Sequence, residues 1–206
     1  MKRINKGSKE ILKMKLFMAL LFILLVIPST SFAEQEFETV FIEEMTWTEV
    51  RDAIKAGKTT VIFPTGGTEQ NGPHMVLGKH NFIVKYAAQQ IAQRLSNALV
   101  APVLAYVPEG GIYPPTGHMR FPGTITLPKK HFMKVTEYAA RSFKVNGFKN
   151  IVLIGDSGGN QNGLMMVAMA LNEEWVDTDI HVHYIPDYYN ASYPQGGDFF
   201  KWLQSQ

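Results

Sequence analysis

Hydrophobic positions along the chain predict strands that alternate with helices. Short apolar runs bounded by polar residues are typical of buried strands, and apolar residues at every third or fourth position are typical of helices. Strands are predicted at 59–63, 99–107, 150–154 and 180–185. Helices are predicted at 46–56, 81–96, 128–146 and 163–171. This alternation predicts a three-layer α/β fold, with a mostly parallel sheet between two layers of helices.

Residues that begin, end or interrupt helices and strands refine these predictions. Thr46-Trp-Thr-Glu49 is a capping-box sequence that predicts the start of a helix. Pro102 interrupts the second predicted strand, which indicates an edge position or an irregular start. Residues 108–123 hold four Pro and four Gly and are predicted to form a long loop. Residues 124–127 are short and β-like in composition.

The first 33 residues have the order of a signal peptide. A basic segment precedes an unbroken apolar run at 16–27, and small residues lead to Ala33. We expect cleavage before Glu34, which leaves residues 34–206 as one domain. An uncleaved anchor is the alternative, but the apolar run is shorter than the ~20 residues that a spanning helix needs. The expected location is therefore periplasmic or extracellular, without a membrane attachment after cleavage.

Charge and cysteine content exclude several classes of function. The whole chain carries a net charge of +2, whereas residues 1–33 carry six basic side chains and one acidic one. The remaining residues are therefore acidic, with a net charge of −3, and nucleic-acid binding is not expected. The absence of Cys excludes a disulfide framework, a thiolate metal site and a Cys nucleophile.

The richest chemistry lies in a Gly-rich segment, residues 65–80, between the first predicted strand and the following helix. It contains one carboxylate, Glu69, together with Asn71, His74 and His80. Loops that follow parallel strands meet at one edge of the sheet, where α/β proteins place their sites. A second such loop, 155–160, follows the third predicted strand and contains Asp156 and Ser157.

Three segments resemble the creatininase family of metal-dependent amidohydrolases. Residues 69–74, Glu-Gln-Asn-Gly-Pro-His, are similar to the start of its E-Q-H-G-P-H-L-P-x-x-x-D signature. Residues 118–124 resemble its H-x-x-F-P-G-T segment, and residues 155–160 lie where the family has N-G-H-G-G-N. The resemblance implies a creatininase-like α/β fold, hydrolysis of a small, possibly cyclic, amide and a homo-oligomer.

The resemblance also implies a set of metal ligands, which this chain keeps only in part. Glu69 is unchanged, whereas Asn71 and Ser157 stand where the family has His ligands, and His80 stands where it has a bridging Asp. Imidazole binds one ion only, so a single divalent ion, zinc or manganese, is expected rather than two. The expected ligands are Glu69, His80 and Asp156. His118 is the candidate catalytic acid or base.

Other interpretations of these residues stay open at this stage. Asp156 also suits a helix cap, and His118 also suits a solvated loop. The altered ligand positions equally fit a non-catalytic relative that binds a small ligand or a partner. Residues 155–159, Gly-Asp-Ser-Gly-Gly, resemble the nucleophile motif of chymotrypsin-like serine proteases, but a Ser between a buried strand and a helix does not fit that all-β fold. Creatininase relatives continue with a segment carrying a further His and Glu, so the chain is expected to be shortened at its C-terminus.

Overall fold

The computed structural model describes residues 39–192. The expected signal peptide lies outside these residues. Eleven elements follow one another along the described part of the chain: η1 (Ile42–Glu44), α2 (Trp47–Lys55), β1 (Thr60–Thr65), α3 (Lys79–Leu95), β2 (Ala98–Val100), η2 (Gly117–Arg120), α4 (Lys129–Asn146), β3 (Asn150–Gly155), α5 (Gly158–Glu174), β4 (His181–Tyr184) and α6 (Pro186–Ser192).

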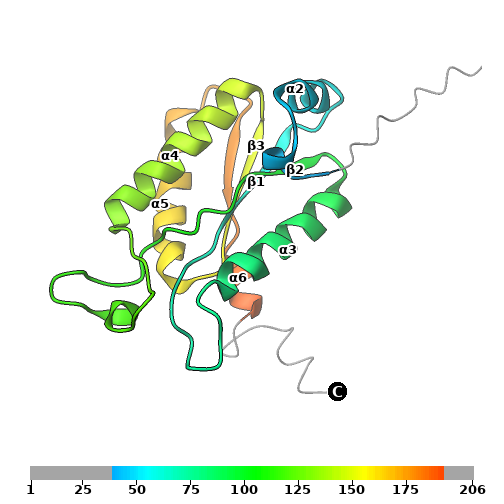
Figure 1. The fold of residues 1–206 in the computed structure, drawn as a ribbon. Helices are drawn as coiled ribbons and strands as arrows, with labels where there is room; N and C mark the ends of the chain where they lie inside the picture. The colour runs from blue at the N-terminus through cyan, green and yellow to red at the C-terminus, as the bar shows by residue number, and fades with distance from the viewer. Residues whose placement is uncertain (1–38, 193–206) are drawn as a thin grey trace, which may run out of the picture. The chain divides into compact units, whose positions relative to one another are not determined.

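The four strands form one parallel sheet in the order β2-β1-β3-β4. Helix α3 covers one face of the sheet, and α4 and α5 cover the other (Figure 1). The predicted three-layer α/β fold is therefore confirmed, and the sheet is wholly rather than mostly parallel.

Side chains alternate between two cores along the central strands. Val61 of β1 and Leu153 of β3 belong to the core beneath α4 and α5, whereas Ile62 and Ile154 belong to the core beneath α3. Both faces of the sheet are thus apolar, because each is covered by helices. This explains why the central strands appear in the sequence as unbroken hydrophobic runs rather than as alternating ones.

The element boundaries differ from the sequence prediction in several places. The predicted strand 99–107 is wrong in extent: β2 ends at Val100, and only isolated bridges continue it. Pro102 explains this end, since proline has no N–H for a ladder. Residues 124–127 likewise make only bridges. Helix α5 begins at Gly158, five residues before its predicted start, although Gly158 and Gly159 favour a loop in isolation.

A topological switch point lies between β1 and β3. The connection after β1 runs through α3 to β2 on one side, whereas the connection after β3 runs through α5 to β4 on the other side. Loops that leave neighbouring strands in opposite directions open a crevice at the carboxyl ends of those strands, which is the usual binding position in such sheets. The two sequence motifs follow these two strands.

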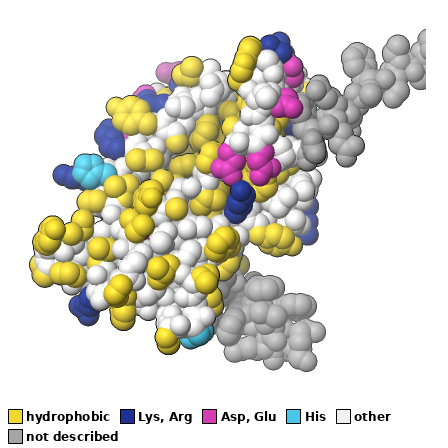
Figure 2. Space-filling model, in the orientation of Figure 1, with side chains coloured by type: hydrophobic (Ala, Val, Ile, Leu, Met, Phe, Trp, Pro, Cys, Tyr) yellow, Lys and Arg dark blue, Asp and Glu magenta, His cyan; other side chains and the backbone are white. Residues whose placement is uncertain are grey.

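The surface in Figure 2 shows hydrophobic side chains spread among polar ones, with few charges. On α3 and the loop before it, the exposed apolar side chains include Val76, Phe82 and Tyr86. Within residues 39–192, no helix has the length and apolar character required to cross a bilayer.

Candidate functional site

The loop after β1 is anchored by neighbouring asparagines. The Asn160 side chain, fully buried in α5, donates hydrogen bonds to Thr65 Oγ1 at 2.9 Å and to the Gly66 carbonyl at 2.8 Å. Asn81, in the first turn of α3, accepts one from the Gly67 N–H at 3.0 Å. A Cβ on Gly66 would lie 2.1 Å from Asn81 Oδ1. Only glycine therefore lets the loop approach α3 closely enough to aim Glu69 inward.

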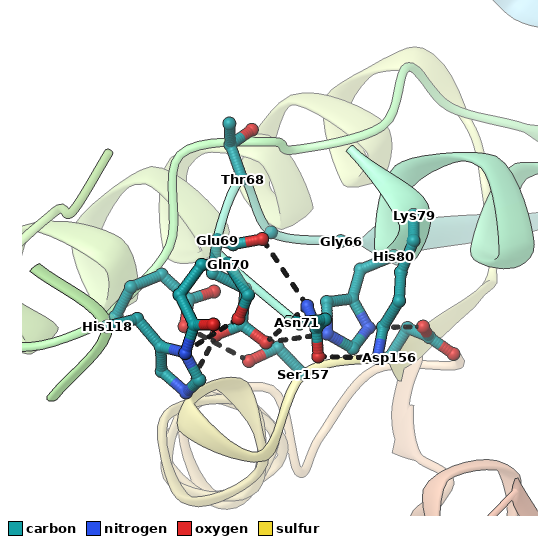
Figure 3. A network of polar contacts seen from close by, with 12 residues as sticks. Gly66, Thr68, Glu69, Gln70, Asn71, Lys79, His80, His118, Asp156 and Ser157 are labelled. Carbon is teal, nitrogen blue, oxygen red and sulfur yellow. Dashed lines mark hydrogen bonds and ion pairs between the residues drawn. The ribbon is translucent and has the colours of Figure 1, made fainter. Parts of the chain in front are cut away.

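His80 lies between two carboxylates at the carboxyl ends of β1 and β3. Its Nε2 is 2.7 Å from Glu69 Oε1, and its Nδ1 is 2.5 Å from Asp156 Oδ2. All three side chains are buried. Tyr188 of α6 donates a hydrogen bond to the other Asp156 oxygen at 2.9 Å. This row of groups occupies one side of Glu69, as Figure 3 shows.

On the other side of Glu69, Figure 3 shows His118. Glu69, Glu109 and His118 form a second cluster. His118 Nε2 is 3.3 Å from Glu69 Oε2. One possible ligand atom from each of Glu69, Glu109 and His118 lies within 4.8 Å of the other two. Both glutamates are buried, whereas His118 is half-exposed. The cluster is therefore reached from the His118 side.

The pKa values of the two glutamates move in opposite directions. Burial opposes the ionisation of Glu69, but its contacts with His80 and Glu109 outweigh burial and lower the pKa of Glu69 to about 2. Burial, together with the neighbouring Glu69 carboxylate, raises the pKa of Glu109 to about 9. Two carboxylates this close do not both ionise without a cation, so in the protein alone Glu69 carries the charge and Glu109 the proton.

The neighbouring carboxylates favour the charged form of His80. Burial disfavours the imidazolium, but the hydrogen bonds to Asp156 and Glu69 outweigh burial and raise the pKa of His80. An imidazolium donates at both nitrogens, which matches the two carboxylate oxygens that His80 contacts.

The side chains at the family's ligand positions have other partners in this structure. The Asn71 amide accepts a hydrogen bond from Lys79 Nζ at 2.6 Å, and Ser157 Oγ lies 3.5 Å from Glu109 Oε2. The positive side chain of Lys79 next to Asn71 disfavours a metal ion there. His80 uses both nitrogens on carboxylates. The family positions therefore do not fit two ions, whereas the group of Glu69, Glu109 and His118 has the donor types for one.

The structure brings together all four residues proposed from the sequence. Glu69, His80 and Asp156 form one contiguous row, and His118 contacts Glu69 from the opposite side. Their roles stay predictions. Asp156 precedes the N-cap residue of α5, which is Ser157. Glu109 was not predicted as a site residue, because it lies in the Pro/Gly-rich loop without a recognised motif. Its acidic character within an apolar and Gly-rich stretch was the available signal.

Comparison with known proteins identifies the family. The family model for creatininase, described as creatinine amidohydrolase, matches residues 43–203. The chain belongs to the creatininase family. This match includes the whole sheet and all the site residues named above, so the resemblance of the three motifs is confirmed at the level of the family.

Curated relatives in this family carry hydrolase names. Creatinine amidohydrolase of Pseudomonas putida is 28% identical over 130 residues, which cover 63% of this chain and 48% of that protein. The mycofactocin precursor peptide peptidase of Mycolicibacterium smegmatis is 29% identical over 133 residues, 62% of this chain and 51% of that protein. The chain thus spans about half the length of these relatives.

Solved creatininase structures share the fold. A crystal structure of creatinine amidohydrolase is 25% identical with a TM-score of 0.59, over 80% of this chain and 67% of that one. A mutant creatininase complexed with creatine gives a TM-score of 0.64 at 24% identity, over 76% of this chain and 61% of that one. Two further similar structures are a Zn–Zn form and a Mn form of creatininase.

Proposed function

We propose that this chain is an exported amidohydrolase of the creatininase type, which hydrolyses a C–N bond of a small amide with one divalent ion, zinc or manganese. The observation that carries this proposal is the position of Glu69. It is the unchanged acidic residue of the family motif, it is buried at the switch point, and a second carboxylate and an imidazole lie beside it.

The relatives support the reaction class. Amidohydrolase and peptidase are both names for enzymes that hydrolyse C–N bonds of amides, although the substrates named differ. Similar structures with zinc or manganese support the choice of ion. The substrate class that we propose for this chain, a small amide, rests on these likenesses.

The ion and the side chains of such a site would have different roles. A divalent ion there would supply Lewis acidity, which polarises an amide carbonyl and makes water a stronger nucleophile. Glu69 and Glu109 are buried, so substrate approaches past the half-exposed His118. His80 holds the Glu69 carboxylate in place at 2.7 Å, and Asp156 in turn orients His80 through a contact of 2.5 Å.

The test is hydrolysis by the purified chain with and without a chelator. Creatinine and a set of cyclic and linear small amides serve as substrates. We expect turnover that chelation abolishes and that added Zn²⁺ or Mn²⁺ restores. Glu69→Ala should remove metal and turnover together, whereas His131→Ala, an exposed change on α4, should alter neither. Turnover that survives complete chelation would contradict metal dependence.

A non-catalytic binding protein is the second candidate, and Asn71 and Ser157 favour it because both replace family ligands. It predicts no turnover of any amide in the set, with wild type and Glu69→Ala alike.

The family resemblance further implies a homo-oligomer, which light scattering coupled to size-exclusion chromatography measures directly.

A further inference from the structure

We propose that the chain binds its divalent ion through Glu69, Glu109 and His118, and that His80 and Asp156 act as positioning residues rather than as ligands. This ligand set differs from the family positions and also from the set expected from the sequence. The inference rests on the metal dependence proposed above, and it assigns a new function to Glu109.

The two oxygens of Glu69 face different partners. Oε1 accepts from His80 Nε2 at 2.7 Å and lies 3.4 Å from the Asn71 amide. Oε2 faces His118 Nε2 at 3.3 Å. The inner oxygen is therefore saturated by donors, and the outer oxygen is the one available to an ion.

Glu109 supplies an observation that is independent of the family motif. It is 4% exposed, and its Oε1 has no hydrogen-bond partner among the described residues. A buried carboxylate oxygen without a partner is costly and points to a missing ligand. A Cβ on Gly67 would lie 2.4 Å from this oxygen. The glycine at 67 thus leaves the space that the carboxylate occupies beside Glu69.

His118 presents the correct nitrogen. Its Nδ1 lies 3.1 Å from the Gln70 carbonyl oxygen and 3.3 Å from the Gln70 side-chain amide nitrogen. In the tautomer that donates from Nδ1 to the carbonyl, the lone pair of the neutral ring is on Nε2, the atom that faces Glu69. This is the usual way in which a backbone carbonyl fixes the tautomer of a metal-binding histidine. Two carboxylate oxygens and this ring nitrogen converge on one position, where a cation would displace the proton of Glu109.

The backbone holds Glu109 and His118 together. The His118 N–H donates to the Glu109 carbonyl at 3.0 Å, and the Glu109 N–H donates to Thr126 Oγ1 at 3.0 Å. At Gly110, which has φ 138°, a Cβ would lie 2.0 Å from the Thr116 carbonyl oxygen. The Pro/Gly-rich loop is therefore closed at its base, and this closure places both side chains.

The separations suit one ion. Ligand atoms bound at about 2.1 Å lie no more than about 4.2 Å apart. The group spans 4.8 Å at most, so a small contraction gathers it around one ion. His80, by contrast, would have to give up a carboxylate contact to free a nitrogen.

The test measures Zn²⁺ binding and the imidazole ligand of the bound ion. Calorimetric titration with Zn²⁺ alone is performed on the full chain and on Glu109→Gln, His118→Ala, His80→Gln, Asp156→Asn and His131→Ala. Loss of a partner outside the ligand set costs about 10–100-fold in affinity, so loss of a ligand costs at least about 100-fold. We expect losses beyond that level for Glu109→Gln and His118→Ala, smaller ones for Asp156→Asn, and none for His131→Ala.

X-ray absorption at the zinc edge separates the two ligand sets. We expect one imidazole ligand in the wild type, its loss in His118→Ala and its retention in His80→Gln. Circular dichroism identifies any variant that does not fold, and if His80→Gln is one, the fate of the imidazole ligand in His118→Ala decides between the two sets. Retention of the imidazole in His118→Ala, its loss in His80→Gln, or no Zn²⁺ bound by the wild type would overturn the inference.

The same samples are assayed for amide hydrolysis, which separates the inference from the proposed function. If an ion binds through Glu109 and His118 but no amide is hydrolysed, the ligand set is supported and the proposed amidohydrolase function is contradicted. Chelator-resistant turnover with no ion bound overturns the inference and leaves amide hydrolysis standing.

Discussion

Replacing the family's bridging Asp by His80 exchanges an anion for a cation. A carboxylate at that position would draw two ions together, whereas the His80 ring pairs with both Glu69 and Asp156 through its two nitrogens. The row from Asp156 through His80 to Glu69 therefore needs no metal on its inner side. In the ligand set that we propose, the ion lies on the outer side, with Glu109 as the second carboxylate. The replacement at His80 would account for both the single ion and the shifted ligands of that proposal.

Ser157 tests whether the Gly-Asp-Ser-Gly-Gly sequence has a chemical role. Removal of a catalytic nucleophile costs on the order of a million-fold in kcat. Ser157 is buried, and its hydroxyl lies at a long 3.5 Å from Glu109. We therefore expect Ser157→Ala to retain kcat for the best amide substrate to within about tenfold, since only one weak hydrogen bond is lost.

The matched control is Ser142→Ala, whose hydroxyl bonds the backbone of α4 on the exposed surface. A covalent adduct trapped on Ser157, or chelator-resistant activity that disappears in Ser157→Ala, would establish the opposite mechanism.

Among the elements, the central strands and the long helices could be predicted because burial imposes a pattern on them. Strand β3 is a run of apolar residues that pack on both faces, and α4 ends at a glycine with φ 103°. The hydrophobic pattern does not predict an element whose structure is determined by tertiary contacts. The first turn of α5 contains two glycines, yet it is helical because tertiary contacts outweigh propensity.

The site residues likewise include some that strand topology places and one that only the contacts of a loop place. Glu69 and Asp156 could be placed together from topology, because they follow adjacent parallel strands. Glu109 could not, because its position depends on a 16-residue loop closed by particular hydrogen bonds and by glycines. No periodicity in the sequence encodes such a closure.

Gly159 links α5 to the loop that carries Glu109. A Cβ at this position would lie 2.1 Å from the Pro108 carbonyl oxygen, which belongs to the backbone and cannot rotate away. We expect Gly159→Ala to lower the free energy of unfolding by about 1–3 kcal/mol, the usual cost of overpacking. It should also weaken Zn²⁺ binding, because Pro108 must move and Glu109 is the next residue.

Gly78→Ala is the control, since its Cβ would make only an ordinary contact, 3.4 Å from the Phe82 ring. Urea unfolding and Zn²⁺ titration measure the two effects. Unchanged Zn²⁺ affinity in a destabilised Gly159→Ala would show that the loop moves without Glu109.

At the scale of the whole molecule, the sheet order explains why one edge carries the chemistry. The crossovers after β1 and β3 diverge, and the loops that follow these strands meet the Pro/Gly-rich loop there. Every group in the proposed site comes from residues 69–156, within the part that the family model matches. The fold supplies the crevice, and the side chains at 71, 80 and 157 within it differ from the family signature.

Export is the last property to test, and it follows from the order of charge and hydrophobicity at the N-terminus. We expect the exported protein to begin at Glu34, because small residues at Ser31 and Ala33 suit signal peptidase after an apolar run. The intact mass of the protein from the periplasm or medium should equal that of residues 34–206. Ala33→Glu places a charge at the cleavage position and should leave the leader attached, while Glu34→Gln should be processed normally. Exported protein that retains Met1 to Ala33 would contradict this prediction and favour the uncleaved anchor.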